Sequence, residues 1–121
     1  MLSQLGQIAL TVTDLERAVQ FYRDTLQVPF LFDFPGLAFF NCAGVRLMLS
    51  KPEASAVNAG GSVLYFKVAD IQAEARNLKS RNVKFEQEPH LIAKMPDHEL
   101  WMAFFRDPDG NLLALMSEVR P

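Results

Sequence analysis

The chain has 121 residues, of which 50% are hydrophobic and 21% are charged, and its formal net charge is −2. This length suits a single hydrophobic core, and no apolar run reaches the about 20 residues that a membrane span requires. Basic residues are mixed with acidic ones along the chain, which argues against a nucleic-acid-binding surface. The first residues carry no basic region before an apolar stretch, so we expect no signal peptide and a cytoplasmic protein.

Short alternating or apolar runs predict eight strands along the chain. They lie at Gly6–Val12, Pro29–Asp33, Leu37–Cys42, Val45–Ser50, Ser62–Val68, Lys84–Ile92, Glu99–Arg106 and Asn111–Ser117. Apolar residues at helical spacing predict one helix after the first strand and one after the fifth. Their stripes are Leu15, Ala18, Val19, Tyr22 and Leu26, and Ile71, Ala75 and Leu78.

The helix ends carry recognisable capping residues. Thr13 and Glu16 have the spacing of a capping box, so we expect Thr13 to cap the first helix. Asp70 is expected to cap the second helix, and Asn82 suits the exit from it.

The predicted elements repeat. Both halves read β-α-β-β-β, and "IALTVTDLERAVQFYRDTLQV" in the first half is echoed by "LYFKVADIQAEARNLKSRNV" in the second. We therefore predict an α+β fold made of two tandem modules in one domain over residues 1–121. Module one covers residues 1–50 and module two covers 62–121. The small, polar stretch "KPEASAVNAGG" at residues 51–61 is the predicted linker.

Two motifs connect this pattern to a known family. The opening "LGQIALTVTDLERAVQFYRDTL" and the closing "DPDGNLLAL", together with the tandem modules, resemble the vicinal oxygen chelate superfamily. That superfamily includes glyoxalase I, bleomycin resistance proteins and extradiol dioxygenases. The resemblance implies that each four-stranded sheet curls into a half-barrel, and that the chain forms a homodimer. It also implies that enzymes of this kind hold a divalent metal with four side chains, from the first and last strand of each module.

The resemblance locates those four positions in this sequence. The first-strand position lies seven residues before the Asp of Val-x-Asp, at Gln7 and Val63, and the last-strand position falls at Met48 and Ala114. Valine and alanine have no donor atom, and a thioether is a poor ligand for hard cations. Gln7 alone cannot hold a divalent metal. We therefore expect no metal at the usual site and no other cofactor.

The stretch "EPHLIAKMPDHELWMAFF" reads as a long hairpin and carries both histidines of the chain. His90 and His98 are expected to lie within reach of each other. The functional interpretation is a ligand pocket lined by His90, His98 and Trp101, with Glu99 or Asp97 orienting an imidazole. The alternatives are a hairpin edge with local hydrogen bonds, or a relocated metal site built from the two histidines and a carboxylate.

Three function classes remain open from the sequence. The first is a binding protein that holds a small organic molecule in a half-barrel cleft, with Gln7, His90, His98, Glu99 and Trp101 as candidate ligand-binding residues. The alternating phenylalanines of residues 30–40 favour it, although they also suit a core. The second is a divalent-metal-dependent lyase, isomerase or dioxygenase acting on a substrate with vicinal oxygens. The third is a dimerisation module for another protein.

Overall fold

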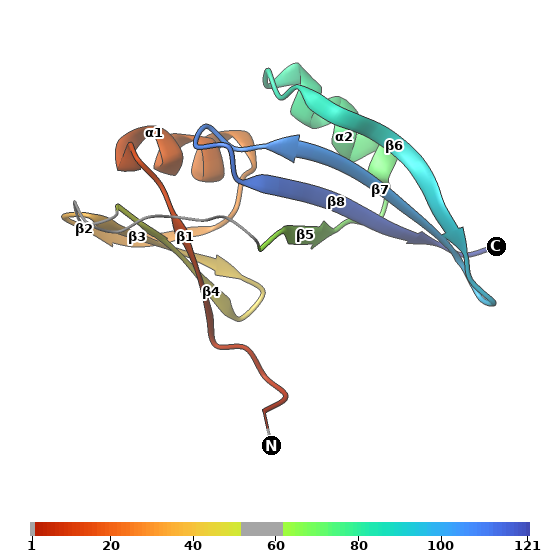
Figure 1. Ribbon diagram of the computed structural model, residues 1–121, viewed down its shortest axis with the longest axis horizontal. Helices are drawn as coiled ribbons and strands as arrows, with labels where there is room; N and C mark the ends of the chain where they lie inside the picture. Colours follow the sequence, from red (N-terminus) through yellow and green to blue (C-terminus); the bar gives the residue numbers. More distant parts are fainter. Residues whose placement is uncertain (1, 52–61) are drawn as a thin grey trace. The chain divides into compact units, whose positions relative to one another are not determined.

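The computed structural model describes residues 2–51 and 62–121 of the chain. Its contacts divide the chain into two compact units, Met1–Gly60 and Gly61–Pro121. Each unit contains one four-stranded mixed sheet and one helical segment (Figure 1). The predicted linker over residues 51–61 lies outside the described residues, except for Lys51.

Unit one has the predicted β-α-β-β-β order. Its elements are β1 (Gln7–Thr11), α1 (Leu15–Gln20) with a π-helical continuation, η1 (Phe21–Thr25), β2 (Phe30–Phe34), β3 (Leu37–Cys42) and β4 (Val45–Ser50). The strand order in the sheet is β1-β4-β3-β2. Strand β1 runs parallel to β4, and the other two pairings are antiparallel.

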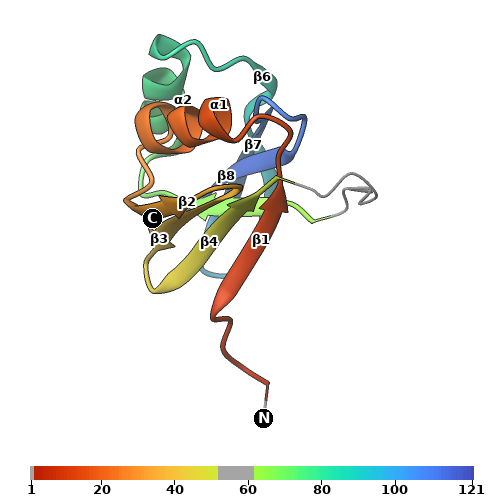
Figure 2. The same cartoon turned by 90° about the vertical axis from the view of Figure 1, so that its left-hand side faces the viewer.

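The helical segment of unit one packs on one face of its sheet (Figure 2). Ala18, Val19 and Tyr22 of the predicted stripe are buried. The Tyr22 ring lies 6.1 Å from that of Phe40, so Phe40 and its alternate neighbours face the helix. The side chains on this face are Leu10, Ala38, Phe40, Leu47 and Leu49, all buried.

The cap of α1 corrects the sequence prediction. Asp14, and not Thr13, is the N-cap residue, because the Asp14 carboxylate accepts a hydrogen bond from the Arg17 backbone N–H at 3.1 Å. Asp and Thr stood next to each other, and the capping-box pattern favoured the wrong one. An ionised carboxylate is an equally good cap and also complements the positive end of the helix.

Unit two repeats the same order. Its elements are β5 (Leu64–Lys67), α2 (Ile71–Ser80), β6 (Phe85–Lys94), β7 (Glu99–Arg106) and β8 (Leu112–Val119). The sheet order is β5-β8-β7-β6, with β5 parallel to β8 and the other pairings antiparallel. The predicted strands therefore all exist, with ends displaced by two residues at most, and the α+β fold of tandem modules with curled, unclosed sheets is confirmed.

The cap, the helix exit and the apolar stripe predicted for α2 are confirmed. The Asp70 carboxylate caps α2 by accepting from the Ala73 N–H at 3.1 Å, and Asn82 takes a positive φ of 70° after the helix. Ile71, Ala75 and Leu78 are buried against the sheet. The predicted turn before β8 is held by Asp107, whose carboxylate accepts from the backbone N–H groups of Asp109 and Asn111.

No helix in the described part of the chain is both long enough and apolar enough to cross a membrane.

The cap assignment gives a stability prediction. Replacing Asp14 by Ala should lower the free energy of unfolding by about 1 kcal/mol, because one helix-terminal N–H loses its acceptor. Asp14→Asn is the matched control and should retain most of the stability, since Asn caps as well as Asp. Urea denaturation followed by circular dichroism measures both. An Asp14→Ala variant as stable as the parent would contradict the assignment.

Candidate functional site

The first and last strands of each module pair in the same register. Ala9 lies opposite Met48 in unit one, and Tyr65 lies opposite Ala114 in unit two. Ala9 and Tyr65 are each five residues before the Asp that caps the following helix. Met48 and Ala114 therefore occupy equivalent places in the two sheets, which agrees with the alignment made from the sequence.

In unit one the two positions where the resemblance expects metal ligands are Gln7 and Met48, which carry an amide and a thioether. The Gln7 Nε2 donates to the Met48 Sδ over 3.9 Å, which is a weak sulfur hydrogen bond. Gln7 is exposed and Met48 is half-buried. One amide oxygen and one sulfur do not make half of a divalent-metal site for a hard cation.

In unit two the two expected metal-ligand positions are Val63 and Ala114, and neither side chain has a donor atom. Ala114 is fully buried, and its two cross-strand neighbours are Tyr65 and Phe104. Their rings meet edge to face with centroids 6.3 Å apart. The space beside Ala114 is thus closed by two aromatic side chains, and Val63 contributes only carbon atoms.

The residues present therefore do not fit the four-ligand metal site that the family resemblance implies. In the ranges 2–51 and 62–121, no three side chains of the His, Cys, Asp and Glu types gather closely enough to hold a metal ion elsewhere.

The face of the first sheet opposite α1 presents three rows of side chains, one row per alternate residue. The first row is Gln7, Arg46 and Asn41; the second is Ala9, Met48, Phe39 and Phe32; the third is Thr11, Ser50, Leu37 and Phe34. Three phenylalanine rings form one cluster there, with Phe32–Phe39 centroids 5.0 Å apart and Phe32–Phe34 centroids 5.5 Å apart. Phe32 and Phe34 remain 41% and 57% exposed, so this cluster is an accessible apolar surface.

The sheet of unit two divides the predicted site residues between its two faces. By strand register, His90 lies opposite Met102 and shares the face of Phe104 and Ala114. Trp101 lies on the other face, opposite Ser117 and on the side of α2. The pocket predicted around both residues is therefore not one site.

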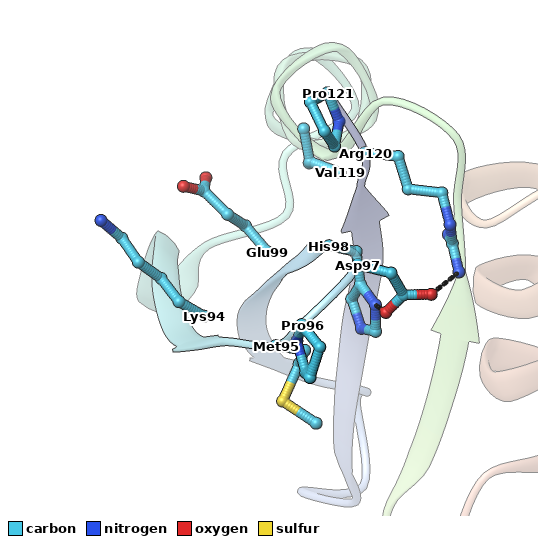
Figure 3. A pocket seen from close by; sticks show the side chains of 9 residues that line it. All are labelled: Lys94, Met95, Pro96, Asp97, His98, Glu99, Val119, Arg120 and Pro121. Carbon is cyan, nitrogen blue, oxygen red and sulfur yellow. Dashed lines mark hydrogen bonds and ion pairs between the residues drawn. The ribbon is translucent and has the colours of Figure 1, made fainter.

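Three of the predicted residues line two hollows at one end of unit two. The first hollow, of about 420 Å³, lies between the β6–β7 turn and the C-terminal residues, and His98 and Glu99 line it (Figure 3). The second, of about 350 Å³, lies beside the start of α2 and is lined by Glu99 and Trp101. The Trp101 Nε1 donates to the Glu99 Oε1 at 3.2 Å, which fixes the indole toward this end of the sheet.

The two histidines are not within reach of each other, which corrects the sequence prediction. His90 lies opposite Met102, whereas His98 precedes Glu99 at the turn. Met102 lies four residues after His98 along the chain, which corresponds to about 13 Å along an extended strand. Instead, the His90 Nδ1 contacts the Glu88 carbonyl oxygen at 2.7 Å. The sequence could not show this, because three irregularities in the β6–β7 register lengthen the hairpin.

His98 adjoins a chain of charged groups, and Asp97, one of its two predicted carboxylate partners, contacts its ring. The His98 Nδ1 lies 2.8 Å from the Asp97 Oδ1, and Arg120 contacts Asp97 at 3.6 Å (Figure 3). Arg120 also contacts Glu118 at 3.2 Å. The hydrogen bond with His98 lowers the pKa of the exposed Asp97 carboxyl, and Arg120 adds to this. Hydrogen bonding from Arg120, followed by the charge of Lys67, lowers the pKa of Glu118.

Sequence reasoning missed two residues that shape these faces, Arg46 and Tyr65. Arg46 is exposed beside Gln7, with its guanidinium carbon 5.6 Å from the centre of the Phe39 ring. Tyr65 and Phe104 cover Ala114. The signal for Tyr65 was available, since it lies two residues after Val63 on the same strand face. Arg46 could have been found in the same way, two residues before Met48.

The tandem β-α-β-β-β fold is the one that the sequence resemblance implied. The model of the Glyoxalase/Bleomycin resistance protein/Dioxygenase superfamily matches residues 4–115, and the chain belongs to this superfamily.

Individual relatives agree with this assignment. The chain is 31% identical to "Uncharacterized protein YraH" of Bacillus subtilis (strain 168), over 93% of this chain and 96% of that protein. Among solved structures, it is similar to a lactoylglutathione lyase from Agrobacterium tumefaciens, with a TM-score of 0.79 and 25% identity over 95% and 93% of the two chains. A superfamily member from Sphaerobacter thermophilus DSM 20745 has a TM-score of 0.78 and 25% identity over 97% and 98%.

The closed surroundings of Ala114 give a second stability prediction. Ala114→Glu should lower the free energy of unfolding by at least about 2 kcal/mol, because the new carboxylate is buried beneath two rings without a partner. Met48→Glu is the matched control at the equivalent position and should cost less, because Met48 is half-buried. Adding Tyr65→Ala to Ala114→Glu should recover part of the loss. Equal stability of the Ala114→Glu variant and the parent would contradict the described packing.

The charge chain gives a pH prediction. Because the folded pKa of Asp97 is depressed, its contribution to stability is complete above the ordinary value of 3.8 and is lost as pH falls through the folded pKa. In a carbon-13 NMR titration the Asp97 carboxyl should titrate below 3.8, and His98→Ala should raise that midpoint. His90→Ala is the control and should leave it unchanged. An unchanged midpoint in His98→Ala would exclude the hydrogen bond as the cause.

Proposed function

We propose that this protein binds a small organic molecule on the helix-free faces of its sheets, without the usual divalent metal of the superfamily. The observation that carries the proposal is the pair of equivalent rows that contain Met48 and Ala114. Where metal-binding relatives need donor atoms, these rows hold carbon and sulfur next to Phe39 and Phe104. Such rows suit the apolar body of a ligand better than a metal-bound oxygen.

The exposure of the phenylalanine cluster supports the same proposal. Aromatic side chains at 41% and 57% exposure cost solvation free energy unless another group covers them. Flat rings in a T-shaped or tilted arrangement offer both edges and faces, which favours ligands that contain an aromatic ring.

We propose a homodimer in the cytoplasm as the working form of the protein. Each sheet ends on two strands that hydrogen bond to one neighbour within their sheet, namely β1 and β2 or β5 and β6. Exposed strand edges are commonly covered by a partner chain. Light scattering measures the mass, and twice the mass of the 13.6 kDa chain is the expected result.

The second candidate is a divalent-metal-dependent lyase, isomerase or dioxygenase acting on a vicinal-oxygen substrate. Its support is the 25% identity to the lactoylglutathione lyase structure. Against it stand the four positions themselves, since Gln7 is the single residue among them with an oxygen donor.

Metal analysis separates the two candidates. Tag-free protein purified without chelator should contain far less than one equivalent of metal, and added Zn²⁺, Ni²⁺ or Mn²⁺ should leave its melting temperature unchanged. Near-stoichiometric metal that is lost in Gln7→Ala would overturn the metal-free proposal and direct the search to vicinal-oxygen substrates.

Ligand binding is tested with fragments. Ligand-observed NMR with a library of aromatic fragments should give hits whose signals weaken in Phe32→Ser. Leu91→Ser is the control, because Leu91 has a similar exposure of 39% but lies in unit two. Hits that respond equally to both variants, or no hits at all, would count against the proposed face.

A further inference from the structure

The helix-free face of unit one has a polar end beside its aromatic cluster. Gln7, Arg46 and Asn41 are directly opposite one another on β1, β4 and β3, in a single row across the sheet. Side chains opposite one another on neighbouring strands have Cβ atoms about 5 Å apart. All three side chains are exposed. We call Gln7, Arg46 and Asn41 the donor row.

The donor row presents hydrogen-bond donors and no negative charge. The guanidinium of Arg46 carries five N–H groups, and in the described part of the chain no carboxylate lies within ion-pair distance of it. The Asn41 Oδ1 already accepts from the Gly44 N–H at 2.9 Å, which leaves the amide nitrogen of Asn41 to donate. The Gln7 Nε2 points at the Met48 sulfur over 3.9 Å and has a second hydrogen to offer.

The same face contains no acidic residue in its three rows, so Arg46 is its single charged group. The contact with the Phe39 ring, at 5.6 Å, holds the guanidinium over the edge of the aromatic cluster. Alternate rows of a sheet are about 7 Å apart along the strands. One small molecule can therefore contact both the donor row and the Phe39–Phe32 row.

We propose that the ligand is an organic anion, with its anionic group on the donor row and its apolar, ring-containing body on Phe39, Phe32 and Phe34. This inference rests on the proposed function and names the class of ligand for the same face. Charge complementarity selects the anion, because a planar guanidinium flanked by two amides matches the oxygens of a carboxylate, sulfonate or phosphate. Gln7, at a metal-ligand position in the resemblance, acts here as a donor.

The test uses two probes that share one aromatic body. 1-Anilinonaphthalene-8-sulfonate carries an anionic sulfonate, and N-phenyl-1-naphthylamine is the same body without it. Fluorescence titrations should show that the parent binds the sulfonate roughly tenfold more tightly than the neutral probe, as expected for a charge-assisted contact. Raising the ionic strength should weaken the sulfonate alone.

Variants then locate the anionic contact. Arg46→Gln should remove the preference for the sulfonate, Arg46→Lys should keep part of it, and Gln7→Glu should weaken it by adding a negative charge to the row. Arg76→Gln is the matched control, because Arg76 is exposed on α2 and the same charge is lost in unit two. Circular dichroism and melting temperature show that each variant is folded; Arg46 is exposed, so its replacement should leave both unchanged.

The outcomes distinguish this inference from the proposed function. If both probes bind equally and Phe32→Ser weakens both, the apolar face binds ligands but the anion inference is wrong. A sulfonate preference that survives in Arg46→Gln, or is lost equally in Arg76→Gln, also overturns it. If neither probe binds, both proposals fail. A lower mass of Phe32→Ser in light scattering would then identify a second copy of the chain as the group that covers this face.

Discussion

The parallel pairing of the first and last strand in each module determines where every other side chain can point. Strand β1 beside β4, and β5 beside β8, set one register per sheet, and the antiparallel strands extend it outward. Because side chains alternate along a strand, this register sorts each residue to the helix or away from it. In unit one, Phe40 and Leu47 thus join the core, whereas Phe39 and Met48, one residue away, face the opposite side. A shift of one residue would exchange the core with the face that carries Phe39 and Met48.

The fold could be predicted because its signals are local and repeated. Alternating apolar residues marked all eight strands, and Asp70 and Asn82 marked the limits of α2. The second module repeated the element order of the first, which supported the prediction for both. The predicted cap of α1 was wrong for a local reason. Thr13 and Asp14 are adjacent, and the capping-box pattern favours the residue three positions before Glu16. The π-helical continuation at Phe21–Thr25 was not foreseen, because the apolar spacing of the stripe is compatible with both helical forms.

The site was less predictable, because it depends on which residues meet across strands. Counting back from Asp14 and Asp70 located Gln7 and Val63, and the register supports Met48 and Ala114 as their counterparts. The same reasoning gave the wrong positions for the side chains of the β6–β7 hairpin in unit two. Its β6 strand carries extra residues relative to β7, so His90 lies far from the turn and faces away from Trp101. Sequence shows which chemical groups are present in a hairpin, but irregular pairing decides which of them share a face.

The two equivalent strand pairs place their large and small residues in opposite order. Unit one places small Ala9 beside large Met48, while unit two places large Tyr65 beside small Ala114. Ala114 is fully buried beside the Tyr65 and Phe104 rings, so a larger side chain at position 114 would clash with them. More than one substitution therefore separates this sequence from a metal site at position 114. A chain that acquired metal chemistry here would need to lose the Tyr65 ring before it could accommodate an acid at position 114, and the intermediate would have neither a filled face nor a ligand set.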